Sequence, residues 1–137
     1  MPPSSSININ VMVNGNDDIT ITPATVDLSA TDGSGNPKYA QPCTLNFNLA
    51  WAQNLTNKPF RFLKTTEDAE CGIDITAQNG TEPTVATEFS WPTVSDNVTS
   101  VSVTDNNTGA GTYNFCVTVK DSADVSHSSD PSIKNRN

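Results

Sequence analysis

The chain has 137 residues, the usual size of one domain with one core, and we expect residues 1–137 to form a single domain. Hydrophobic residues make up 34% and charged residues only 16%, which excludes the high-charge signature of a disordered chain. Seven basic residues against fifteen acidic ones give a net charge of −8, so we expect no nucleic-acid partner.

The first residues predict no targeting segment. Residues 1–6 lack the basic region of a signal peptide and are not followed by its apolar stretch, and no apolar run in the chain approaches membrane-spanning length. We therefore expect a soluble protein without membrane insertion. The cysteines, Cys43, Cys71 and Cys116, are an odd and sparse set, which favours a reducing compartment such as the cytoplasm.

Alternating apolar residues predict strands in the first half of the chain. Residues 7–13 carry Ile or Val at every odd position, and residues 19–22 resume the alternation after the turn-forming pair Asn14-Gly15. A short third strand is expected at residues 26–28. Residues 43–49 then show the clearest pattern of this half, with the inward positions Cys43, Leu45, Phe47 and Leu49.

The second half predicts further short strands near residues 60–62, 73–75, 89–91 and 101–103. The strongest strand spans residues 113–120, where one apolar stripe is formed by Tyr113, Phe115, Val117 and Val119. A last strand, from Val125 to Ile133, is expected beside this stripe, either at an edge or with a bulge, because Pro131 cannot donate a ladder hydrogen bond.

About eight short strands at this spacing, with no window of helical periodicity, predict an all-β fold, an antiparallel β-sandwich. Residues 111–121, Gly-Thr-Tyr-Asn-Phe-Cys-Val-Thr-Val-Lys-Asp, resemble the penultimate strand of immunoglobulin-like modules, especially the bacterial kind related to polycystic kidney disease (PKD) domains. Residues 128–135 resemble the C-terminal part of the uncharacterised bacterial DP-EP family. These resemblances imply a small immunoglobulin-like β-sandwich of bacterial type and supply no activity.

The cysteines depart from the antibody-type pattern, in which the strand's cysteine lies two residues after the corner tyrosine. Cys116 lies three residues after Tyr113 and therefore points to the opposite face. We expect Cys43 to be buried and Cys116 to be turned outward, so that their sulfurs cannot meet in a core disulfide.

His127 is the only histidine, which excludes metal sites that need two imidazoles. Asp124, His127 and Asp130 recur at three-residue spacing, but in strand and turn such spacing alternates faces, and Ser126 and Ser128 lack a nucleophile elbow. We favour a surface histidine. A hydrolase built around His127 stays the third functional hypothesis.

Two acidic segments suggest functions that we favour less. Residues 32–36 begin like an EF-hand loop, but its twelfth position is Cys43 instead of glutamate, which leaves only a looser calcium site gathered from the loop residues Asp17, Asp18, Asp32 and Asp105. Residues 67–70, Glu-Asp-Ala-Glu, are the densest acidic run, and we favour a solvated loop over the facing carboxylates of a glycosidase.

Aromatic residues offer a further alternative, because Tyr39, Trp51 and Trp91 could form a platform for sugars. In the strand alternation, Trp51 falls on the same side as Phe47 and Leu49, and Trp91 on the same side as Phe89. We therefore expect both tryptophans to point into the core. We assign no catalytic, cofactor-binding or metal-binding residues. The leading hypothesis is a non-enzymatic module that acts through protein contacts or self-association, and a carbohydrate- or calcium-binding module is the alternative.

Overall fold

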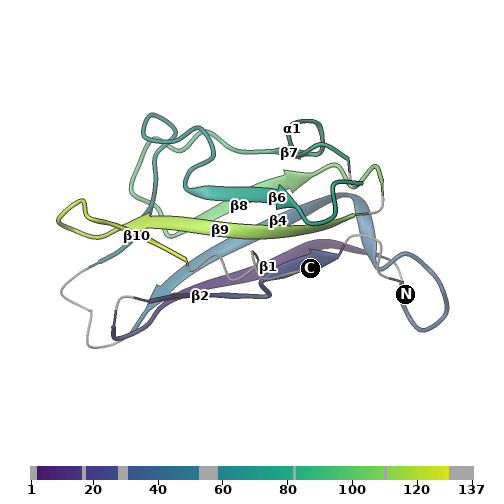
Figure 1. Ribbon diagram of the computed structural model, residues 1–137, viewed down its shortest axis with the longest axis horizontal. Coiled ribbons are helices and arrows are strands. Elements are labelled where there is room, and N and C mark those ends of the chain that lie inside the picture. The colour runs from purple at the N-terminus through teal and green to yellow at the C-terminus, as the bar shows by residue number, and fades with distance from the viewer. Residues whose placement is uncertain are drawn as a thin grey trace.

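The computed structural model describes residues 3–16, 18–27, 31–52, 59–81, 83–109 and 111–129. These residues form ten strands and one four-residue helix, α1 (Val85–Glu88), which confirms the predicted all-β, sandwich-like fold. The long strands run along the long axis of the molecule (Figure 1). No helix in the described residues is long and apolar enough to cross a membrane.

The first sheet has five strands in the order β2-β1-β4-β8-β7. Their bounds are β1 (Ser4–Val13), β2 (Ile19–Thr22), β4 (Tyr39–Trp51), β8 (Ser100–Asp105) and β7 (Phe89–Ser90). The predicted hairpin joins β1 to β2, and its turn is held by Asn14 Oδ1, which accepts hydrogen bonds from the backbone N–H groups of Asn16 and Asp18. This fits the preference of Asn for turns.

One strand pair of this sheet differs from the antiparallel prediction, because β1 and β4 pair in parallel. The reason lies in the path of the chain. After β2 the chain enters the second sheet as β3 (Thr25–Asp27), and it then returns past the turn at residues 32–36 to begin β4 at the end where β1 began. The first sheet is therefore mixed.

The second sheet is built around β9 (Thr112–Lys120), and all its pairs are antiparallel. Both β5 (Arg61–Phe62) and β10 (Ser126–Ser128) pair with Lys120, so these two strands lie on opposite sides of β9. Two more strands, β3 and β6 (Ile73–Ala77), both pair with Asn114 of β9. By the same reasoning they lie on opposite sides of the first half of β9.

A single apolar cluster fills the space between the two sheets. The predicted stripe of β9 is confirmed, since all four of its side chains are buried. Phe115 meets Phe47 of β4 edge to face, with ring centroids 5.3 Å apart, and Tyr113 meets Phe89 of β7 in the same way at 4.7 Å. Edge-to-face aromatic pairs have a preferred geometry and stabilise the core beyond the burial of their apolar surface.

Part of the predicted last strand lies beside β9. Among the described residues, Ser126–Ser128 pair with β9, opposite Thr118–Lys120. Val125 precedes this strand and is 52% exposed, so it lies outside the buried core. Asp130, Pro131 and Ile133 lie outside the described residues.

Candidate functional site

Among the described residues, the outward positions of the strands in the five-stranded sheet carry no charged side chain; at its edge the exposed Asp96 lines a pocket together with Ser100 and Ser102. Inward Ile, Val, Leu and Phe side chains alternate along its strands, and from Thr44 of β4 onward this leaves the outward positions to Asn, Ser and Thr with Met12 and Ala50; Ala40 and Pro42 precede them on β4. We call this surface the polar face. It consists of Asn8, Asn10, Met12, Thr20, Thr22, Thr44, Asn46, Asn48, Ala50, Ser90, Ser100, Ser102 and Thr104.

Strand register arranges the polar face in rows that cross the sheet. Asn46 of β4 lies opposite Asn8 of β1 and opposite Ser102 of β8. Asn46 Nδ2 donates to Asn8 Oδ1 at 3.4 Å, and the Ser102 hydroxyl donates to Asn46 Oδ1 at 2.8 Å. In the next row Ser100 donates to Asn48 Oδ1 at 3.2 Å. The face is therefore an ordered array of neutral donors and acceptors.

The outward positions of the second sheet, unlike those of the polar face, carry charged side chains. There the described strands carry Asp27, Arg61, Asp74 and Lys120. The lack of charge on the polar face is thus a property of one surface of the molecule.

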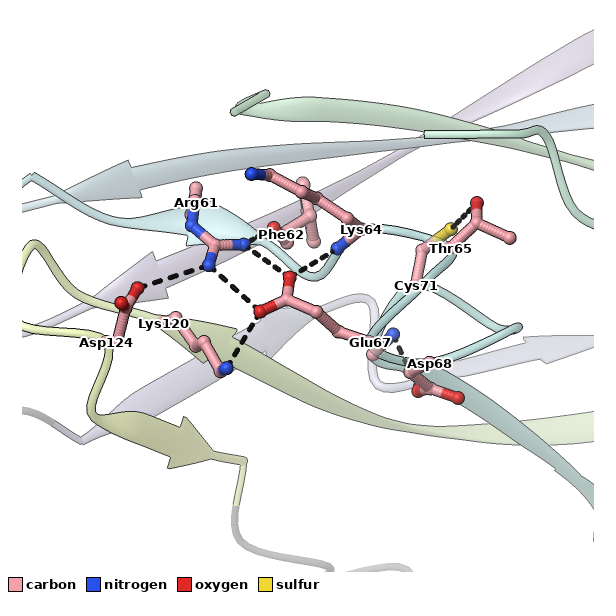
Figure 2. Close-up of polar contacts among 10 residues, drawn as sticks. Arg61, Phe62, Lys64, Thr65, Glu67, Asp68, Cys71, Lys120 and Asp124 are labelled. Atoms are coloured by element: carbon pink, nitrogen blue, oxygen red, sulfur yellow. Dashed lines mark hydrogen bonds and ion pairs between the residues drawn. The ribbon is translucent and has the colours of Figure 1, made fainter. Parts of the chain in front are cut away.

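An ion-pair network joins β5, β9 and the turn that follows β5 (Figure 2). Glu67 accepts two hydrogen bonds from the Arg61 guanidinium, at 2.8 and 3.1 Å, and one from Lys120 Nζ at 2.8 Å. The backbone N–H of Lys64 donates to the same carboxylate at 2.8 Å. Arg61 also reaches Asp124 at 3.3 Å. The hydrogen bonds from Arg61, followed by those from Lys120, hold the pKa of Glu67 well below its usual range.

Residues 67–70 form a turn, with Glu67 and Ala69 exposed, in agreement with the expected solvated loop, and two of its carboxylates are also held by hydrogen bonds. Glu67 is paired as described, and the carboxylate of Asp68 accepts hydrogen bonds from the backbone N–H groups of Glu70 and Gly72. The carboxylates hold the turn together from within. They do not face one another across a cleft, which is the arrangement that glycoside hydrolysis requires.

His127 is half-buried instead of lying on the surface as predicted. Its Nε2 lies 2.9 Å from Asp121 Oδ2, and its ring packs edge to face on Phe60 with centroids 5.5 Å apart. This hydrogen bond is the main cause that lowers the pKa of Asp121. Asp124 instead contacts Arg61, and the flanking Ser128 hydroxyl is bonded to Thr118 Oγ1 at 2.8 Å. Among the described residues the predicted Asp-His-Asp spacing assembles no triad.

Two cavities lie near residues that the sequence singled out. One of about 240 Å³ is lined in part by Phe60, Arg61, Asp121 and Asp124. Another of about 440 Å³ lies against residues 32–38 and Ser4. The first is bounded by charged groups already paired with one another, so it offers little free charge for a ligand.

The looser calcium site that the sequence left open as an alternative is not assembled by the residues that the structure describes. Asp105 is fully buried, whereas Asp18 is exposed on the hairpin. The carboxylate of Asp32 accepts hydrogen bonds from the backbone N–H groups of Ser34 and Asn36 within its own turn. No group of three metal-binding side chains occurs in the described part of the chain, and Asp17 lies outside it.

The described residues do not bring the three aromatic side chains into one exposed platform. Trp51 and Trp91 are partly buried and pack against the core, as parity predicted. Trp91 donates its indole N–H to the carbonyl of Ile73 at 3.1 Å, while Trp51 packs on Phe60. Tyr39 lies at the start of β4, with Lys38 over its ring.

The cysteine prediction is confirmed. Cys43 is fully buried, Cys116 is partly exposed, and all three cysteines are free thiols. Cys71 is also fully buried. Burial is the largest cause that raises the pKa of the Cys43 and Cys71 thiols.

Three buried carboxyl groups, Glu88, Asp105 and Asp121, were missed by the sequence interpretation, although strand alternation marks two of them as inward. Asp105 follows the inward Val101 and Val103, and Asp121 follows the inward Val117 and Val119 at the same period of two. An acidic residue at an inward position needs a buried partner or a proton. For Asp121 that partner is His127.

Comparisons of the chain with protein-family models, with curated proteins and with solved structures find no match. The PKD-type and DP-EP resemblances therefore stay predictions.

Proposed function

We propose that this protein is a non-enzymatic β-sandwich module that acts by self-association through the polar face. The observation that carries the proposal is that the described outward residues of these five strands are all uncharged, on a chain of net charge −8. Two copies of so acidic a protein repel each other in most orientations. Contact between two polar faces removes no charged side chain of those faces from water, so it avoids the largest desolvation cost.

The composition of the polar face supports a protein contact. Interface cores are depleted in Lys, Glu and Asp, which the polar face lacks, and enriched in Met, which it contains; they are also depleted in Ser and Ala, of which the polar face carries four, so the support rests on the missing charges and on Met12. Met12 is 43% exposed on the polar face and is one of two large hydrophobic side chains that are exposed in the described residues. It lies beside Ala50 in the strand register, so the two make a small apolar spot within the neutral array.

The size of the polar face predicts a weak association. Its thirteen residues, each covering about 4.8 Å across the sheet and about 6.7 Å along a strand, give a patch of about 400 Å² per copy. Two such patches bury about 800 Å², which is below the usual size of a specific interface and typical of a weak contact. We therefore expect a reversible dimer with a dissociation constant in the micromolar range or weaker.

Paired charge variants test this function. The double variant Asn8→Asp with Asn10→Asp adds two carboxylates to the polar face, and Asn8 keeps its acceptor for Asn46. The matched control, Asn16→Asp with Asn36→Asp, adds the same charge in exposed turns outside this face. Both variants should keep the native circular dichroism spectrum.

Sedimentation velocity over a wide concentration range gives the readout. The wild-type protein and the control should show a sedimentation coefficient that rises with concentration, while the polar-face variant should stay monomeric at low salt. High salt should restore part of its association, because salt screens like charges. A wild-type protein that stays monomeric at millimolar concentration, or two double variants that associate equally, would overturn the proposal.

A further inference from the structure

A pair of buried carboxyl groups lies where β8 ends, at the opposite end of the sandwich from His127 (Figure 1). Asp105 is fully buried, and its strand register places it between Cys43 of β4 and Phe89 of β7. Asp105 Oδ1 accepts a hydrogen bond from the backbone N–H of Asn107 at 2.8 Å. Asp105 Oδ2 is buried without a partner among the described residues. An ionised carboxylate in this position would hold an unsolvated charge.

Glu88, the second carboxyl group, is as deeply buried but well satisfied. Thr108 donates to it from its backbone N–H at 2.7 Å and from its hydroxyl at 2.9 and 3.1 Å. The titratable groups that act on Asp105 are Glu88 from α1 and the Cys43 thiol from β4. No Lys, Arg or His in the described residues pairs with either carboxyl group.

We infer that Asp105 acts as a proton-controlled latch: the packing of α1 and β7 against β8 is stable while Asp105 is protonated, and it loosens when Asp105 ionises, because the charge on Oδ2 would have no partner there among the described residues. Burial, with a smaller contribution from the charge of Glu88, raises the pKa of Asp105 to about 7. The latch therefore responds near neutral pH, where ordinary carboxylates are already ionised.

The segment on which this latch acts is short and lies at the edge of its sheet. α1 spans four residues and β7 two, and Asn106 donates to the carbonyls of Glu88 and Thr87 at 2.8 and 3.1 Å. Besides these bonds, the hydrogen bonds of Thr108 to Glu88 and the packing of Phe89 on Tyr113 attach the segment to the rest of the sandwich. Short edge elements open more readily than the centre of a sheet. Opening would leave the edge of β8 unpaired.

Hydrogen exchange at pH 6 and pH 8, corrected for the intrinsic exchange rate, tests the latch. Peptides that cover residues 84–90 and 105–109 should be about tenfold less protected at pH 8 than at pH 6. The pKa of Asp105 is about 7 in the closed state and ordinary in the open state, so the equilibrium constant for opening rises by about that factor between the two pH values. Peptides from the centre of β4 and from β9 should show no such change.

Two variants and a control make the outcome decisive. Asp105→Asn, which is neutral at both pH values, should remove the change, and Glu88→Gln should reduce it by removing the neighbouring charge. Asp96→Asn, which alters an exposed carboxylate, should behave as the wild type. Equal protection of the wild type at both pH values, or a tenfold change that survives in Asp105→Asn, would overturn the latch; if Asp105→Asn fails to fold, an unreduced change in Glu88→Gln would do so.

Discussion

The substitution Asp105→Asn should change how global stability depends on pH. Burial raises the pKa of Asp105 from 3.8 to about 7, so the folded state holds a proton that the unfolded state releases. This contribution to stability is complete below pH 3.8 and is lost as pH rises to about 7. Between pH 5 and pH 7 the wild-type protein should lose about 2 kcal/mol of unfolding free energy from this group alone.

Urea denaturation at half-unit steps from pH 5 to pH 8 measures this contribution. The asparagine variant keeps the shape of a protonated carboxyl group and cannot ionise, so its unfolding free energy should lack the decline due to Asp105. Every other group is common to the two proteins, and the difference between their curves isolates Asp105. Parallel curves for the two proteins would refute the reasoning, because they would mean that Asp105 titrates alike in the folded and unfolded states.

Two further predictions follow from backbone geometry and from the thiols. Gly72→Ala should lower the unfolding free energy by about 3 kcal/mol or more, since φ at Gly72 is +80° and a Cβ would collide with the Thr118 carbonyl oxygen; a denaturation midpoint close to that of the wild type would contradict this. In the native, unreduced protein a thiol reagent should modify Cys116 before Cys43 and Cys71, and mass spectrometry that detects a Cys43–Cys116 bridge would contradict the observed parity.

The sequence predicted the strands well wherever one face of a strand is buried. The alternations at residues 7–13, 43–49 and 113–120 lie within β1, β4 and β9, because burial of one face imposes a period of two on the residues. The parallel pairing of β1 with β4 could not be predicted in this way, since periodicity assigns a face to each residue and no partner to the strand.

The candidate sites could be predicted only in part. The outward residues of the polar face follow from the same alternation, but their assembly into one surface depends on which strands are neighbours. The burial of Asp121, the partner of His127, could have been predicted from the sequence, because Asp121 continues the inward positions of β9. The contact of Glu88 with Thr108 joins residues twenty positions apart, and no local pattern marks it.

The most direct test of the central claim is to record two-dimensional NMR spectra of the backbone amides at low and at high protein concentration. Self-association through the polar face predicts concentration-dependent shifts for residues of β1, β4 and β8, including Asn10, Asn46 and Ser102. Amides of β6 and of β9, in the other sheet, should not move. Shifts confined to that second sheet, or none at millimolar concentration, would contradict the account.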